Sequence, residues 1–357
     1  MTVQGFRVLD ADAHVIEPTH VFAEFTDDPL PADLPVDTPL VPVGDFDLLT
    51  DQFEHGFDAP SYVRAMDAQG IDAVVLYPSI GLFVPYLPSL TPDRSADACR
   101  SYNDWMAAYC GHDPARMAGV ALVPLADVDL AVAETKRARD LGLIGVMVRP
   151  NHVYGRNLGD PAYDPLWSAC ASLGMTVSVH EGLGLQGATI GSDRFATFAP
   201  RHAMSHPMEQ MAAMASFVLD GALDRHPDLR VAFLESGTGW LPYWLARLDD
   251  HLEWLAPGRT SATELFDRHC VISSEADDDC VGMVVDRIGP EYVVWASDFP
   301  HPDAVYPGAP AAFLEECEEQ GIDEDDARVI LWDAPLAFYD LEARFTPPNP
   351  EDAGQRR

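Results

Sequence analysis

Short apolar runs alternate with amphipathic stretches along most of this chain. The apolar runs are rich in Val, Ile, Leu and Ala and contain few charges, which is typical of strands buried on both faces. These runs predict strands at residues 6–14, 71–78, 117–124, 143–150, 175–180, 229–236, 269–274 and 292–298. The amphipathic stretches predict helices at residues 61–70, 92–112, 127–142, 160–174, 206–227, 239–255, 261–268, 277–289 and 310–341.

The regular alternation of strand and helix implies a parallel sheet with right-handed crossovers. Eight such units in 357 residues favour a (β/α)8 TIM barrel of the α/β class. The alternative is a doubly wound open sheet, which is less favoured because no GxGxxG follows the first strand and no GxxxxGK[ST] occurs. We expect one barrel domain over residues 1–345, with insertions near 27–59 and 181–205, and a polar tail at 346–357.

Composition narrows the classes of partner. The chain has 22 Lys and Arg against 58 Asp and Glu, a net charge of −36, so we expect neither nucleic acid nor an anionic membrane as partner. Hydrophobic residues make up 47% of the chain, enough for a large core and too many for a disordered acidic protein. No apolar run of 18 residues and no signal-peptide pattern is present, and the six cysteines form no CxxC pair. We therefore expect a cytoplasmic protein with reduced thiols.

Four polar residues lie at the strand ends where barrel enzymes place their reactive groups. Asp12 and His14 end the first strand and, being two residues apart, share one face. His180 ends the fifth strand and Asp298 ends the eighth. Each alone is compatible with a structural role, as a turn cap or a core histidine. Together they favour one divalent metal ion, with Zn²⁺ as the first expectation and Mn²⁺ or Mg²⁺ as alternatives, because His and Asp are common metal ligands.

On these motifs the chain resembles the amidohydrolase-related (amidohydrolase 2) family. The similar segments are LDADAHVIEP at 9–18, VSVHEG at 177–182, the block 206–254 and WASDFPHPD at 295–303. The resemblance covers residues 6 to about 340 and implies a metal-dependent (β/α)8 barrel. The family contains hydrolases and non-oxidative decarboxylases such as aminocarboxymuconate-semialdehyde decarboxylase. In the family pattern the metal ligands fall on Asp12, His14, His180 and Asp298.

Two positions depart from the decarboxylase branch of that family. Asp12 stands where the branch has the first His of its HxH motif, which weakens metal binding or shifts the metal preference. Glu235 stands at the end of the sixth strand, where the branch has a His that works beside the metal. Glu235 is interpreted either as an acid–base group whose pKa burial raises or as a structural carboxylate bonded to the turn at 237–239.

A second group of residues is expected around the metal. His206 precedes Pro207 at an expected helix start, where it either caps the helix or enters the site. We predict Asp298, Glu235 and His206 as catalytic residues. The predicted substrate-binding residues are His202, His301, Phe83, Tyr86 and Tyr154. Glu17 is expected to be a loop carboxylate, and Arg149 either meets a substrate carboxylate or is a surface charge.

Three functions fit these expectations. The first is hydrolysis of a small amide, ester, lactone or C–C substrate by metal-activated water. The second is non-oxidative decarboxylation of an aromatic or unsaturated acid, which the family supports and the missing sixth-strand His opposes. The third is a non-catalytic barrel that acts as a binding protein, in which no tight metal is held. A homodimer is expected by analogy with the family alone.

Overall fold

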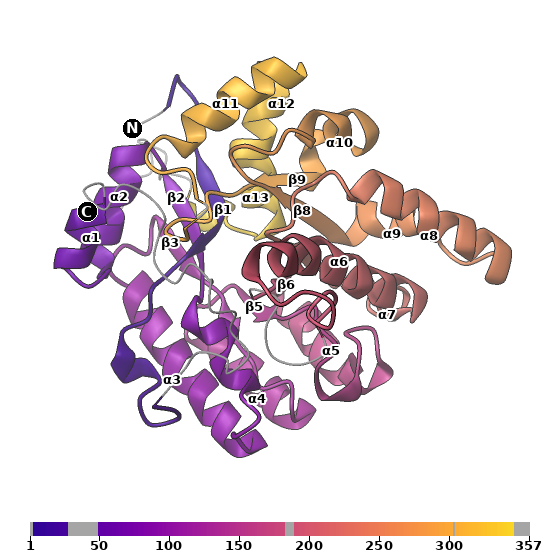
Figure 1. Ribbon diagram of the computed structural model, residues 1–357, viewed down its shortest axis with the longest axis horizontal. Coiled ribbons are helices and arrows are strands. Elements are labelled where there is room, and N and C mark those ends of the chain that lie inside the picture. Colours follow the sequence, from indigo (N-terminus) through magenta and orange to yellow (C-terminus); the bar gives the residue numbers. More distant parts are fainter. Residues whose placement is uncertain (1–2, 28–48, 183–188, 303, 346–357) are drawn as a thin grey trace, which may run out of the picture.

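The computed structural model describes residues 3–27, 49–182, 189–302 and 304–345. Within these residues a ring of parallel strands is surrounded by helices, as the sequence predicts for a (β/α)8 barrel (Figure 1). The strands are β1 (Leu9–His14), β2 (Ala73–Tyr77), β3 (Met117–Gly119), β4 (Ala121–Leu122), β5 (Gly145–Val148), β6 (Thr176–Val179), β7 (Val231–Phe233), β8 (Cys270–Ser274) and β9 (Val293–Trp295). Every expected strand is confirmed, and all are fully buried.

The barrel closes at two places where the ladder is interrupted. Strands β3 and β4 are two halves of one expected strand, joined at Val120, whose N–H donates to the carbonyl of Leu76 at 3.1 Å. At the other seam the N–H of Asp298 donates to the carbonyl of Asp12 at 3.1 Å, and that of His14 to the carbonyl of Phe299 at 2.8 Å. The second seam therefore ties two expected metal ligands, Asp12 and Asp298, to each other through the backbone.

The helices follow the strands and cover the outside of the ring (Figure 1). They are α1 (Thr50–Glu54), α2 (Ala59–Gln69), α3 (Pro92–Cys110), α4 (Val128–Asp140), α5 (Asp164–Leu173), α6 (Phe198–Leu219), α7 (Ala222–Arg225), α8 (Leu241–Leu255), α9 (Ala262–His269), α10 (Val281–Ile288), α11 (Ala309–Gln320), α12 (Glu324–Arg328), α13 (Ala334–Phe338) and α14 (Glu342–Phe345). Side-chain caps start several of them: Asp58, Thr91 and Asp127 each accept a hydrogen bond from the N–H three residues ahead.

Helix α6 corrects one expectation. It begins at Phe198, eight residues before the expected start, so Pro207 lies inside the helix and does not open it. A proline inside a helix removes one backbone hydrogen bond, and here the face that carries Ser205 and His206 is buried against the barrel. Packing of that face accounts for the continued helix. The expected insertion at 181–205 therefore ends as the first turns of α6.

Parts of the other expected irregular segments lie outside the described residues, namely 28–48 of the first insertion, 183–188 of the second and the tail at 346–357. Among the helices that the structure describes, none combines the length and the apolar character needed to cross a membrane.

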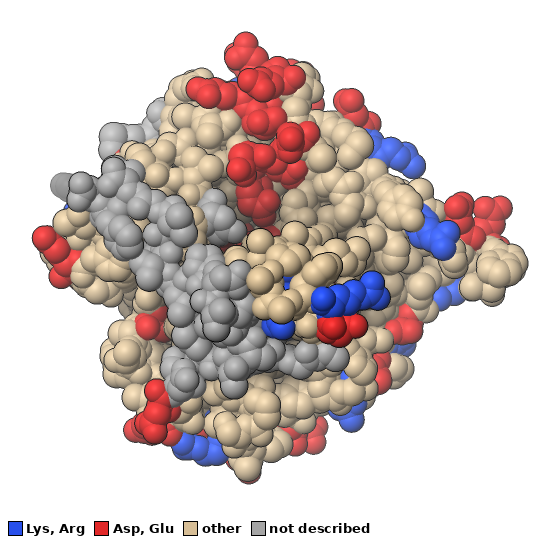
Figure 2. Space-filling view, in the orientation of Figure 1, with Lys and Arg blue, Asp and Glu red and all other residues tan. Residues whose placement is uncertain are grey.

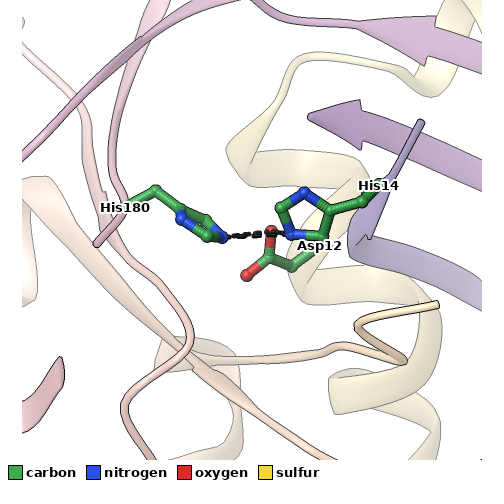
Figure 3. A group of neighbouring side chains, drawn as sticks. All are labelled: Asp12, His14 and His180. Carbon is green, nitrogen blue, oxygen red and sulfur yellow. Dashed lines mark hydrogen bonds and ion pairs between the residues drawn. The ribbon is translucent and has the colours of Figure 1, made fainter. Parts of the chain in front are cut away.

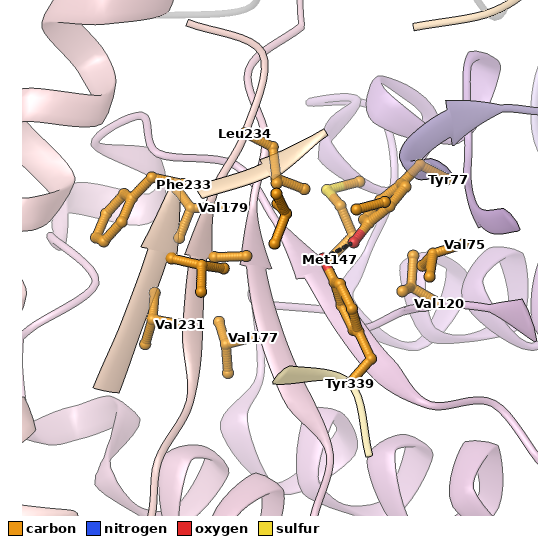
Figure 4. Close-up of a cluster of buried hydrophobic side chains, with 14 of the residues drawn as sticks. Val75, Tyr77, Val120, Met147, Val177, Val179, Val231, Phe233, Leu234 and Tyr339 are labelled. Atoms are coloured by element: carbon orange, nitrogen blue, oxygen red, sulfur yellow. Dashed lines mark hydrogen bonds between the residues drawn. The ribbon is translucent and has the colours of Figure 1, made fainter. Parts of the chain in front are cut away.

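Buried apolar side chains pack around the strands, and a small polar cluster lies among them (Figure 4). Tyr77 on β2 and Tyr339, which follows α13, meet there with their hydroxyls 2.8 Å apart. The Tyr77 hydroxyl also lies 2.9 Å from Oγ of Ser178 on β6. All three side chains are buried, and the hydroxyls are one another's hydrogen-bond partners.

Candidate metal centre

Asp12, His14 and His180 point toward one another at the carboxyl ends of their strands (Figure 3). Nε2 of His14 lies 3.1 Å from Nε2 of His180. Oδ1 of Asp12 lies 3.9 Å from the first nitrogen and 3.7 Å from the second. Oδ1 of Asp298 lies 3.3 Å from Nε2 of His14. The structure thus brings together the four residues that the sequence singles out as metal ligands.

Hydrogen bonds to the backbone fix the tautomers of both histidines. Nδ1 of His14 lies 2.8 Å from the carbonyl of Pro78, and Nδ1 of His180 lies 2.7 Å from the carbonyl of Glu181, so each Nδ1–H donates. Burial lowers the pKa of both imidazoles, most strongly that of His14, and keeps them neutral. Each Nε2 therefore presents a lone pair to the other, an arrangement that a shared cation stabilises.

The carboxylate of Asp12 fits the same cation. Oδ1 of Asp12 is buried and has no hydrogen-bond partner among the described residues. Burial raises the pKa of Asp12 well above its usual range, and the charges of Glu235 and Asp298 raise it further. A buried carboxylate without a donor is costly unless a cation compensates it. The donor set therefore suits a divalent ion such as Zn²⁺ or Mn²⁺.

Asp298 belongs to a second chain of contacts. Its Oδ1 lies 2.9 Å from Nδ1 of His301, and Nε2 of His301 lies 2.8 Å from Oγ of Ser79. The His301 ring stacks on that of His14 with 4.0 Å between centroids. His301, expected to bind substrate, thus contacts Asp298 directly; its contact with substrate stays a prediction.

Glu17 holds the loop that carries Ser79. Its Oε2 accepts hydrogen bonds from the N–H groups of Ser79 and Ile80, at 3.2 and 2.9 Å, and its Oε1 accepts one from Gly81 at 2.9 Å. The side chain is buried, and burial raises its pKa. The expected loop carboxylate is therefore an anchor for the β2 loop beside the centre.

Glu235 lies on the opposite side of His180. It lies two residues after the end of β7, and its N–H donates to Oγ of Ser273 at 2.9 Å. Its Oε2 lies 3.1 Å from Nε2 of His180 and its Oε1 lies 3.4 Å from Nε2 of His206. Although burial acts to raise it, His206 and His180 hold the pKa of Glu235 well below its usual range. Burial lowers the pKa of His206, but the charge of Glu235 outweighs burial and raises it to about 9.

The expected substrate-binding residues are spread more widely. The ring of His202 lies 4.1 Å from that of His206, tilted by 37°, and His202 lines a cavity of about 350 Å³ next to the centre. Phe83, Tyr86 and Tyr154 are not among the described residues that line this cavity. Phe83 and Tyr86 are buried, whereas Tyr154 is half exposed and donates to the carbonyl of Pro85. Their contact with substrate remains a prediction.

Arg149 forms a buried ion pair, which the sequence pattern left undecided. Arg149, after β5, is fully buried and lies 3.2 Å from Oε1 of Glu181, which also accepts a hydrogen bond from Asn151 at 2.8 Å. It is therefore not a surface charge. Its position in the apolar run that ends at residue 150 is the signal that indicates burial.

Fold and site together define a (β/α)8 barrel with a candidate metal site at the carboxyl ends of its strands. Residues 9–341 match the model of the amidohydrolase family over nearly the whole chain, and the protein belongs to that family.

Two curated relatives and one solved structure illustrate the likeness. The chain is 25% identical over 235 residues to 2-amino-3-carboxymuconate-6-semialdehyde decarboxylase of Dictyostelium discoideum, a match that covers 64% of this chain and 64% of the relative. It is 25% identical over 254 residues to gamma-resorcylate decarboxylase of Rhizobium radiobacter, covering 67% of this chain and 75% of the relative.

The related solved structure is that of dihydroxybenzoic acid decarboxylase from Polaromonas sp. JS666 with bound manganese and the inhibitor 2-nitroresorcinol. It superposes with a TM-score of 0.69 at 20% identity, over 96% of this chain and 100% of that chain. This likeness supports the barrel fold.

Proposed function

We propose that this protein is a metal-dependent, non-oxidative decarboxylase of a hydroxylated aromatic or unsaturated carboxylic acid. The observation that carries the proposal is the contact between Asp298 and His301 beside the cluster of Asp12, His14 and His180. Decarboxylation consumes one proton for each CO₂ released, so the site needs a proton donor next to the reacting carbon. The names of the two curated relatives favour this reaction over hydrolysis.

Asp12, His14, His180 and Asp298 would hold the ion. When bound, a divalent ion orients an anionic substrate and stabilises the charge that develops during the reaction. We expect Zn²⁺ or Mn²⁺, since manganese is bound in the related Polaromonas structure. The fixed Nδ1–H bonds of His14 and His180 keep both Nε2 atoms available as donors.

Asp298 and His301 handle the proton. A carboxyl at Asp298 protonates the substrate carbon that bears the carboxylate, the C–C bond then breaks, and CO₂ leaves. The electrons of that bond return to the ring or double bond. His301 returns a proton to Asp298 through its Nδ1, and Ser79 holds the far nitrogen of the imidazole.

The test is a parallel screen of the Mn²⁺-loaded and Zn²⁺-loaded protein. Hydroxybenzoates, including 2,6-dihydroxybenzoate, are assayed for CO₂ release and for the matching phenol. Esters and lactones are assayed for hydrolysis. We expect stoichiometric CO₂ and phenol with at least one acid. Hydrolysis without any CO₂ release would support the sequence's first expectation, and no turnover with full metal occupancy would support a binding protein.

A further inference from the structure

The cavity beside the centre has an unfavourable charge for an anionic substrate. Its titratable lining residues are His202, His206, Glu235, Glu275, Asp277 and Asp298, and no Lys or Arg is among the described residues that line it. On the face shown in Figure 2, a band of acidic side chains runs from the region of α11 toward the middle of the molecule. One divalent ion does not balance these carboxylates, because Asp12 and Asp298 already offset its charge.

His206 is set up as a further ligand. It is 4% exposed, and within the described part of the chain its Nε2 contacts only Glu235, as an ion pair at 3.4 Å from Oε1. Nδ1 of the same ring lies 3.3 Å from the carbonyl of His202 and 3.2 Å from Oγ of Ser205. His14 and His180 have the same arrangement: Nδ1 lies next to a backbone carbonyl, which leaves Nε2 on the side of the ring that faces the other site residues.

His202 and His206 face the same direction because they are four residues apart on α6. Their ligand nitrogens and a carboxylate oxygen of Glu235 all lie within 4.8 Å of one another. Tetrahedral zinc ligands at 2.0–2.2 Å from the metal are about 3.3 Å apart. The 3.4 Å between His206 Nε2 and Glu235 Oε1 already matches that spacing.

The two oxygens of Glu235 lie against different groups. Oε2 is 3.1 Å from His180, a ligand of the first centre, and Oε1 is 3.4 Å from His206. A carboxylate with one oxygen on each group is the usual bridge in two-metal sites, whose ions are about 3.5–4 Å apart.

We propose that His202, His206 and Glu235 hold a second divalent ion and that Glu235 bridges the two ions. Two histidines and one carboxylate leave a coordination position open toward the cavity, where a substrate carboxylate or phenolate binds. The second ion replaces the proton that Glu235 favours on His206, and it supplies a positive charge where the described lining has no Lys or Arg. In this arrangement His206 is a metal ligand, and the proton is handled by Asp298 and His301 alone.

The experiment measures metal stoichiometry and does not depend on any substrate. The chelator-treated full chain is loaded with Mn²⁺, dialysed against excess Mg²⁺ to remove ions from the acidic surface, and analysed for manganese. Electron paramagnetic resonance then shows whether the bound Mn²⁺ ions are magnetically coupled. We expect two ions per chain with a coupled signal in the wild type.

The variants are His206→Asn and His202→Asn, and the control is His251→Asn. His251 lies on α8 and, like His206, has its Nδ1 next to the carbonyl four residues back, at 2.8 Å. We expect one uncoupled ion in each of the first two variants and two coupled ions in the control. One retained ion shows that the barrel and the first centre are intact. A single ion in the wild type, two uncoupled ions, or two ions in both cavity variants would overturn the proposal. This inference rests on the proposed function, but none of these results decides it, because decarboxylation is tested separately by CO₂ release.

Discussion

Nδ1 of His301 lies 2.9 Å from Oδ1 of Asp298, the residue whose N–H bonds to Asp12 across the barrel seam. The backbone contact that closes the barrel therefore places Asp298 between Asp12 and the imidazole of His301. Movement of the segment after β9 would therefore change two contacts of Asp298, the backbone bond to Asp12 and the side-chain contact with His301.

His301→Gln is expected to lower kcat for decarboxylation by about 10²–10⁴-fold, the usual contribution of general acid–base catalysis. Gln cannot return a proton to Asp298, yet it fills similar space. Steady-state kinetics and metal analysis of the variant provide the check. Ser79→Ala removes only the hydroxyl next to Nε2 of His301 and should lower kcat less. An unchanged kcat in His301→Gln would contradict the proposed proton route.

Removal of the metal is expected to destabilise the wild type. A ligand bound only by the folded state adds about 2.7 kcal/mol when its free concentration is one hundred times Kd. Melting curves of the Mn²⁺-loaded protein with and without EDTA should therefore differ in Tm. His180→Ala should show a clearly smaller difference, and His112→Ala, in a loop away from the centre, the full one. Equal shifts in His180→Ala and the wild type would argue against this centre.

Glu17→Gln is expected to cost about 1–3 kcal/mol of unfolding free energy, because the amide nitrogen of Gln faces backbone donors that the carboxylate satisfied. Urea unfolding measures the loss. Glu24→Gln, at an exposed position, is the matched control and should change stability by less than about 0.5 kcal/mol. If both variants unfold at the same urea concentration, the anchor role of Glu17 is wrong.

Tyr77→Phe and Tyr339→Phe should each destabilise the barrel by about 1–2 kcal/mol, since each removes one hydroxyl from a buried pair. The double variant should cost less than the sum, because the second change removes a group that has already lost its partner. Strict additivity in denaturant unfolding would show that the two hydroxyls do not stabilise each other.

The pH dependence of stability is expected to carry a contribution from His269. Burial lowers its pKa in the folded protein, where Nδ1 lies 2.8 Å from the carbonyl of Leu229. Below about pH 6.5 the unfolded chain binds a proton at this position that the folded chain refuses. Stability should therefore fall as pH decreases, by up to about 1.4 kcal/mol per pH unit.

His269→Asn keeps the hydrogen-bond donor and removes the titration. The stability difference between wild type and this variant should shrink from pH 8 to pH 5 in urea unfolding series. His112→Asn serves as control and should follow the wild type throughout. Parallel curves for wild type and His269→Asn would contradict the prediction.

The strands and the closeness of the four expected metal ligands could be predicted from sequence because both depend on local rules. Buried parallel strands are continuous apolar runs, and the strand period places Asp12 and His14 on one face. The end of a barrel strand then identifies His180 and Asp298 as their neighbours.

The surroundings of Glu17, His202 and His206 could not be predicted in the same way. The three hydrogen bonds of Glu17 reach residues more than sixty positions away, so no local pattern indicates them. The HPME sequence at 206–209 is typical of a helix start, so the sequence pattern places His202 outside the helix. In the structure His202 and His206 are four residues apart on one continuous helix. Packing of α6 on the barrel, which the sequence pattern does not encode locally, decided the outcome.

Glu235 and Asp298 adopt backbone angles of φ +48° and +54°, a region that glycine occupies freely and other residues enter at a cost. Glycine at either position would relax the chain and, at the same time, delete a carboxylate from the centre. A laboratory selection for thermostability alone would thus be expected to enrich such substitutions and to yield robust barrels without chemistry. Engineering of this scaffold has to score function and heat resistance together.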